Sequence, residues 1–120
     1  MTGSKRASAQ RALLPEGLVL GVEQLATVRE LLRQHLPGVE VRAFGSRARG
    51  SPKPTSDLDL MVFSAKPLAP RTWALLADAF AESDLPFKVD LVDAGTTTPS
   101  FRTRALAESV VVQPAAPAVA

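Results

Sequence analysis

Several residue types and patterns that mark whole classes of protein are missing from this chain of 120 residues. It has no cysteine, which excludes a disulfide framework and a thiolate metal site and fits a reducing cytoplasm. No stretch approaches the roughly 20 apolar residues that span a bilayer, and no apolar run follows the basic residues near the start, so neither a membrane span nor a signal peptide is expected. The single histidine, His35, ends a predicted helix, where a capping or helix-dipole role is expected. These absences predict a cytoplasmic protein.

Strong net charge is also lacking. The formal charge is +2, which by itself does not indicate a nucleic-acid-binding protein. The distribution of charge is more informative, because residues 41–56 contain four bases and no acid, and two acids follow at once: Arg42, Arg47, Arg49, Lys53, Asp57 and Asp59. A basic loop beside an acidic pair suits a ligand that is both anionic and metal-bound, although a solvated loop beside a strand is the usual interpretation of such a charge run.

Length and composition predict one small domain with flexible ends. Residues 1–17 are polar and basic, and we expect them to form a flexible arm. Residues 114–120 are rich in proline and alanine, and we expect a disordered tail there. The folded unit is then residues 18–113.

Hydrophobic periodicity divides this unit into alternating elements. Apolar residues recur at helical spacing in three segments, so helices are expected over 22–36, 70–83 and 98–109. Alternating or short apolar runs predict strands over 39–44, 57–63, 87–92 and 110–112. The intervening segment 46–56 is rich in turn residues.

This order of elements predicts an α/β fold of the α+β type, a small mixed sheet with helices packed on it. The first two strands can pair either antiparallel or parallel. The helix between the second and third strands implies a crossover connection.

Two acids begin the second predicted strand. Since side chains alternate between the faces of a strand, Asp57 and Asp59 share one face, roughly 6–7 Å apart along the backbone, and Leu58, Leu60 and Val62 face the core. Two carboxylates on one face repel each other unless a cation lies between them, and oxygen ligands suit Mg²⁺. Plain solvent exposure at a sheet edge is the usual explanation for an isolated pair of this kind.

A third acid strengthens the metal hypothesis. Asp90 lies in the third predicted strand, on the face opposite Phe87, Val89 and Leu91, and it reaches the acidic pair if the two strands are neighbours. An acid between apolar residues is costly unless it is paired or binds a metal. Three convergent carboxylates hold metal ions for phosphoryl transfer, and the third can deprotonate an incoming hydroxyl.

A Gly-Ser turn precedes the acids. Gly45, at a strand end, lets the backbone approach a ligand closely, and the residues after it can open a short helix whose free N–H groups face a phosphate. Ser46 adds a hydroxyl, and Arg47 and Arg49 can add positive charge for a triphosphate. Gly-Ser alone is uninformative because turns are rich in it. Its spacing is informative, since ten residues separate Ser46 from Asp57-x-Asp59 and each motif adjoins a predicted strand.

This combination resembles a known family. The segment AFGSRARGSPKPTSDLDLMVF resembles the signature of the nucleotidyltransferase superfamily related to DNA polymerase β, and LPFKVDLVDAGTTTPSFRTRALAESVVV resembles its downstream part. The similarity spans residues 22–113 and is greatest to minimal nucleotidyltransferases, small chains that pair with a separately encoded helical substrate-binding or HEPN protein. The resemblance implies that Gly45 and Ser46 hold the triphosphate, Asp57 and Asp59 ligate Mg²⁺, and Asp90 completes the metal site and helps to activate the acceptor.

The resemblance also implies a function. Arg47 and Arg49 match the local family pattern as nucleotide-binding residues. The expected enzyme is a Mg²⁺-dependent nucleotidyltransferase that moves a nucleoside monophosphate, AMP from ATP, to a hydroxyl group. That hydroxyl belongs either to a helical HEPN toxin, in an antitoxin role, or to a small molecule held by the helical partner. A hetero-oligomer is expected, and neither a membrane nor a nucleic acid is indicated as a partner. The alternative is a non-catalytic nucleotide-binding subunit that acts by occluding its partner.

Overall fold

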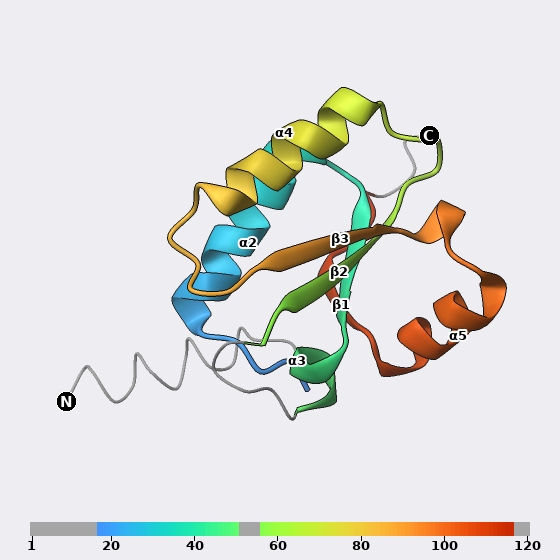
Figure 1. Cartoon of the computed structure of the whole chain (residues 1–120), viewed down its shortest axis with the longest axis horizontal. Coiled ribbons are helices and arrows are strands. Elements are labelled where there is room, and N and C mark those ends of the chain that lie inside the picture. The colour runs from blue at the N-terminus through green and yellow to red at the C-terminus, as the bar shows by residue number, and fades with distance from the viewer. Residues whose placement is uncertain (1–16, 51–55, 117–120) are drawn as a thin grey trace.

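The computed structural model describes residues 17–50 and 56–116. A four-stranded sheet lies at its centre, with helices on both sides (Figure 1). The strands are β1 (Glu40–Phe44), β2 (Leu58–Phe63), β3 (Val89–Asp93) and β4 (Val110–Gln113). Their order across the sheet is β3-β2-β1-β4, and β2 pairs parallel with β3 while β1 pairs antiparallel with β2 and β4. The predicted mixed sheet is confirmed, and the open choice for the first two strands is settled as antiparallel.

Every predicted helix is present. The helices are α2 (Val22–His35), α4 (Pro70–Ala81) and α5 (Pro99–Glu108), and the turn segment contributes a one-turn helix, α3 (Ser46–Arg49), while the 3₁₀ turn η1 (Ala94–Thr96) follows β3. The Thr98 hydroxyl accepts a hydrogen bond from the Phe101 amide and so caps α5, as N-cap threonines do. The ends of the predicted helices and strands differ from the observed ones by one or two residues, which is usual because terminal turns fray.

One face of the sheet is covered by α2 and α4 (Figure 1). Apolar residues of the strands, Val41, Ala43, Leu58, Leu60, Val62 and Val112, form the main core with Leu25, Val28, Leu32, Leu76 and Phe80 of these two helices. The predicted alternation along β2 is therefore confirmed, because its leucines and valine lie on this closed face.

The opposite face is covered only in part, by α5 and η1 (Figure 1). A smaller apolar cluster lies there, consisting of Phe44, Met61, Ala94 and Ala105 with Phe101 packed against it. The rings of Phe44 and Phe101 meet edge to face, with centroids 5.8 Å apart. Phe63 and Val92 also pack against this cluster, and Asp59 lies on the same face of β2 as Met61.

The predicted arm and tail lie largely outside the described residues. Only Gly17 of the arm is described, and of the tail only residues 114–116. The Ala116 amide donates a hydrogen bond to the Gly38 carbonyl at 3.0 Å, so the chain stays on the domain beyond β4. Lys53, in the basic stretch, also lies outside the described residues. Within residues 17–50 and 56–116, the helices are too short or too polar to cross a membrane.

Candidate functional site

The turn between β1 and α3 is built around a glycine. Gly45 has φ 79° and ψ −159°, a backbone conformation that side-chain-bearing residues rarely adopt. A Cβ atom placed on Gly45 would lie 2.2 Å from Oδ2 of Asp59. Glycine at this position therefore lets the carboxylate of Asp59 lie directly against the backbone of the turn.

The strand register places the acids on the partly covered face. Phe44 of β1 is opposite Asp59 of β2, and Asp59 is in turn beside Asp90 of β3. Asp57 lies immediately before β2. The structure thus brings together Gly45 and the acids at positions 57, 59 and 90, as the sequence pattern predicts for neighbouring strands.

The carboxylate of Asp59 lies in an unfavourable electrostatic environment. Its pKa is raised, first because partial burial removes water from the carboxylate and then because Asp90 and Asp57 carry like charge nearby. Arg49 partly offsets this effect on the pKa of Asp59, and Glu108 adds to it. A cation bound beside Asp59 would offset both its burial and the like charge of its neighbours.

The acidic side chains do not form a closed cage. Among the described residues, no three side chains of the metal-ligating types are gathered closely enough to hold an ion. Asp59 and Asp90 are neighbours across β2 and β3, and Asp57 directly precedes β2, so the convergence of the three on one metal ion stays a prediction. Their carboxylate oxygens still suit a hard divalent cation, and binding one requires the side chains to turn toward a common point.

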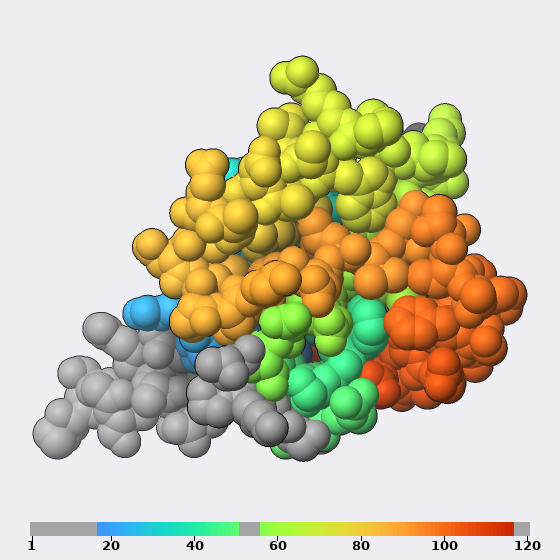
Figure 2. Space-filling view, viewed as in Figure 1, coloured from blue at the N-terminus to red at the C-terminus, as the bar shows by residue number. Residues whose placement is uncertain are grey.

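A cavity of about 420 Å³ opens beside the Gly45 turn, a size in the range of small-ligand pockets. Its walls come from β1, α3, β2 and α5, through Phe44, Gly45, Ser46, Arg49, Asp59, Phe101, Arg104, Ala105 and Glu108. In the space-filling view, α3 (green-blue) and α5 (orange-red) lie side by side on this side of the molecule (Figure 2). Three predicted nucleotide-binding residues line this cavity: Gly45, Ser46 and Arg49.

The two arginines of α3 have different positions. Arg47 is buried and points into the domain, where its guanidinium donates to the carbonyl of Ser56 at 3.1 Å and that of Val19 at 3.3 Å. It also lies over the ring of Phe87, 4.2 Å from the centroid. Burial lowers the pKa of this guanidinium. Because α3 turns Arg47 away from the cavity, its position does not support the predicted contact with a nucleotide. Arg49 is exposed and does face the cavity.

Sequence reasoning missed Glu108, the last residue of α5. One of its carboxylate oxygens, Oε2, accepts a hydrogen bond from the Gly45 amide at 2.6 Å and lies 3.0 Å from Nη1 of Arg49. It is 63 positions from Gly45, so no local spacing connects the two. The one available signal is that an acid ends a helix, where the helix dipole disfavours negative charge and some other partner is needed.

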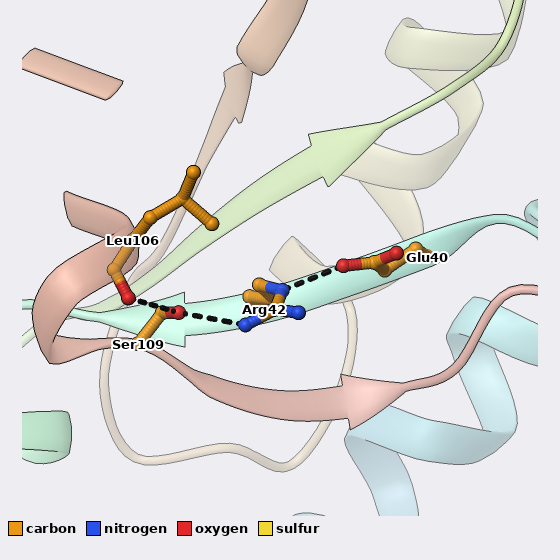
Figure 3. Close-up of polar contacts among 4 residues, drawn as sticks. All are labelled: Glu40, Arg42, Leu106 and Ser109. Carbon is orange, nitrogen blue, oxygen red and sulfur yellow. Dashed lines mark hydrogen bonds and ion pairs between the residues drawn. The ribbon is translucent and has the colours of Figure 1, made fainter. Parts of the chain in front are cut away.

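A second polar network fixes the end of α5 to the sheet (Figure 3). Arg42 of β1 donates to Glu40 at 2.6 Å and to the hydroxyl of Ser109 at 3.2 Å. That hydroxyl in turn donates to the carbonyl of Leu106 at 2.9 Å. Since Ser109 directly follows Glu108, the network holds the backbone next to the cavity in place.

Comparison with known proteins agrees with this geometry. Residues 25–113 match the model of the nucleotidyltransferase domain family. The probable protein adenylyltransferase MntA of Haemophilus influenzae is 46% identical over 91 residues, which cover 76% of this chain and 80% of that protein.

Solved structures show the same fold. The chain resembles one from a toxin–antitoxin crystal structure with AMP-PNP at a TM-score of 0.64 and 26% identity, covering 75% of this chain and 73% of that chain. It also resembles a chain in a complex of tri-AMPylated Shewanella oneidensis HEPN toxin with an MNT antitoxin, at a TM-score of 0.58 and 24% identity, covering 75% and 69%. With a family match from residue 25 to residue 113 and the same mixed sheet, the chain belongs to the nucleotidyltransferase domain family.

Proposed function

We propose that this chain transfers AMP from ATP to a hydroxyl group on a HEPN-type protein with which it forms a hetero-oligomer. The observation that carries the proposal is the cavity in which the Gly45-Ser46 turn lies directly against Asp59. The relatives support the choice of reaction and partner, since one is named a probable protein adenylyltransferase and another is found with an AMPylated HEPN toxin.

The triphosphate would lie along the start of α3. The hydroxyl of Ser46 and the guanidinium of Arg49 line the cavity and are donors that suit phosphate oxygens. Arg47 supports this segment from beneath, by holding α3 on the carbonyls of Ser56 and Val19. Positioning of this kind supplies most of the catalysis in phosphoryl transfer.

Mg²⁺ fits the acids on the partly covered face. Asp57, Asp59 and Asp90 would hold it, and a cation would offset both causes of the raised pKa of Asp59, which are burial first and then the like charge of the other two acids. When bound, the ion would neutralise part of the negative charge of the triphosphate.

The transfer itself exchanges one phosphorus–oxygen bond for another. The acceptor oxygen forms a bond to the α-phosphorus as the bond from that phosphorus to the bridging oxygen breaks, and pyrophosphate leaves. Asp90, which is exposed at the edge strand β3, takes the proton of the acceptor hydroxyl.

The test is transfer of label from α-labelled ATP in Mg²⁺ to a candidate HEPN-type partner chain. The matched control is the Asp57→Asn/Asp59→Asn double variant, with circular dichroism to check that it folds. Label on the partner with the unaltered chain and none with the variant supports the proposal. If neither the unaltered chain nor the variant labels the partner, under conditions where the unaltered chain binds nucleotide, the proposal is contradicted.

The second candidate is a non-catalytic subunit that binds nucleotide and occludes its partner. It is favoured by one observation, that no three acidic side chains are gathered into a metal-binding group among the described residues. The same double variant separates the two functions. If it still binds and still inhibits the partner, occlusion is the mechanism; if it binds but no longer inhibits, transfer is.

A further inference from the structure

Glu108 already uses donors that a triphosphate would need. The amide of Gly45 and the guanidinium of Arg49 both meet the same oxygen, Oε2, of this carboxylate. Both donors line the cavity, as does Glu108 itself. In the protein without ligand, an acid from α5 thus has the place beside the Gly45 turn that an anionic ligand would take.

The surroundings make this a poor place for a fixed negative charge. Glu108 ends α5, where the partial negative charge of the helix terminus repels a carboxylate. It also adds to the negative charge that raises the pKa of Asp59. Among the residues that the structure describes, only Arg49 is ion-paired with Glu108; the side chain of Arg49 is 54% exposed, and exposed pairs of this kind contribute little. A ligand with several phosphate oxygens and more charge competes well for these donors.

The backbone next to Glu108 is held independently of this contact. Ser109 is bound to Arg42 of β1, and its hydroxyl also donates to Leu106 of α5 (Figure 3). The carboxylate can therefore leave the Gly45 amide by rotation of its own side chain, without movement of α5. Its side chain is 27% exposed, so it has solvent to turn into.

We propose that Glu108 sets the affinity for nucleotide, by occupying the donors of Gly45 and Arg49 in the free protein and giving them up to the triphosphate. This rests on the proposed function, since it assumes that the cavity binds a nucleoside triphosphate. Removing the charge of Glu108 then strengthens binding of triphosphate, because the phosphate no longer has to displace an anion or lie beside one.

The test measures Kd by calorimetry for AMP-PNP with Mg²⁺, and for inorganic tripolyphosphate without metal, in four proteins. These are the unaltered chain, Glu108→Gln, Glu108→Ala, and Glu82→Gln as a charge-matched control, because Glu82 is exposed at the end of α4 on the other side of the sheet. We expect both Glu108 variants to bind both probes about threefold to tenfold more tightly, because Glu108→Gln removes the ion pair that phosphate must displace and Glu108→Ala removes the ion pair and the hydrogen bond. The Glu82 variant should be unchanged, and the gain should shrink as salt is raised.

A positioning role for Glu108 predicts the opposite pattern. Glutamine keeps an oxygen that can accept from the Gly45 amide, so a carboxylate that merely holds the turn would give weaker binding in Glu108→Ala and unchanged binding in Glu108→Gln. That pattern, or equal affinities in all four proteins, overturns the inference and leaves the proposed function standing. Failure of every variant to bind either probe overturns both.

An NMR measurement gives a readout apart from affinity. In the free protein the Gly45 amide proton donates to a carboxylate, which moves its resonance downfield. We expect the Glu108→Ala variant to lose that shift while resonances of α2 and α4 stay in place. A Gly45 resonance that does not respond to this substitution contradicts the contact on which the inference rests.

Discussion

Across β2, each side chain on the face under α2 and α4 is apolar and buried, whereas the other face carries Asp59 at the cavity and a smaller apolar cluster around Met61. The closed face gains its stability from burial, which depends on area and tolerates any well-packed apolar side chain. The open face depends on individual atoms, such as the carboxylate of Asp59 against Gly45. Substitutions on the closed face should therefore lower the stability of the fold, whereas substitutions on the open face should lower activity.

The largest effect is expected on the open face and in activity alone. Asp59→Asn should lower the rate of transfer by about 10³-fold, because loss of metal binding removes several kcal/mol of charge stabilisation. The fold should be retained, since an amide of the same shape replaces an acid that is unfavourable where it lies. The rate is measured with α-labelled ATP, beside Asp78→Asn on the exposed side of α4 as a charge-matched control. A retained rate would remove Asp59 from the site.

The adjacent residue on the closed face should show the reverse behaviour. Leu60→Ala removes a fully buried side chain from the main core and should cost roughly 2–5 kcal/mol of the free energy of unfolding. Urea denaturation measures this cost. The folded fraction of the variant should transfer AMP at close to the normal rate per molecule. A lower rate per folded molecule would contradict the assignment of Leu60 to stability alone.

Two glycines with nearly the same backbone conformation separate strain from contact. Gly45 and Gly50 have φ values of 79° and 81°, but a Cβ on Gly45 meets Asp59, whereas a Cβ on Gly50 has no heavy atom of the described residues within 4 Å apart from those of its own chain neighbours. Gly50→Ala should cost about 1 kcal/mol from backbone strain alone. Gly45→Ala should cost about twice that and also weaken nucleotide binding, since the turn or the carboxylate must move. Thermal unfolding and calorimetry give the two quantities, and equal losses in both variants would show that the contact with Asp59 is unimportant.

The arginines of α3 repeat the comparison within a single helical turn. Arg47→Ala should cost roughly 2–3 kcal/mol of stability, because two carbonyls lose a charged donor and Phe87 loses its cation–π partner. Arg49→Ala should change stability by no more than about 1 kcal/mol, as expected for an exposed ion pair. It should instead weaken the binding of AMP-PNP. Denaturation and calorimetry on both variants check this, and a loss of affinity confined to Arg47→Ala would reverse the two assignments.

The smallest effect concerns pH. Because folding raises the pKa of Asp59, its stabilising contribution is complete below the unfolded pKa of about 3.8 and is lost as pH rises through the raised folded pKa. In EDTA, Asp59→Asn should therefore be slightly more stable than the unaltered chain at neutral pH, by less than about 1 kcal/mol after solvent screening. The difference should vanish in acid. Thermal unfolding as a function of pH measures it, and a variant that is less stable at neutral pH would contradict the sign.

Much of this arrangement follows from local sequence. The hydrophobic periods of 3.6 and 2 residues place α2 and β2 correctly, and alternation along β2 alone puts Asp59 and Leu60 on different faces of the sheet. The glycine at position 45 is explained by its φ and by the carboxylate against it. These features were predictable because each depends on residues close together in the chain or on the repeat of one element.

The remaining features depend on how elements meet. Arg47 and Arg49 are identical residues in one helical turn, and the way α3 packs on the domain decides which is buried: Arg47 reaches the ring of Phe87 and the carbonyls of Ser56 and Val19. The contact between Glu108 and Gly45 depends on where α5 ends relative to β1. Sequence spacing predicts neither feature, because both are set by tertiary packing. The side-chain conformations of the acids also cannot be predicted from the pattern of residue types.

The alternation of side chains along β2 has a further consequence, which concerns chains that fold with the wrong strand register. A slip of one residue against β1 would turn the carboxylate of Asp59 toward α2 and α4 and expose Leu58 and Leu60 on the other side. Such a chain would lose its core at the same moment as its cavity. A chain with this register error would therefore stay unfolded and open to proteolysis, and would not form a folded protein with a faulty site. Only chains in which Gly45 and the acids are correctly aligned would be stable.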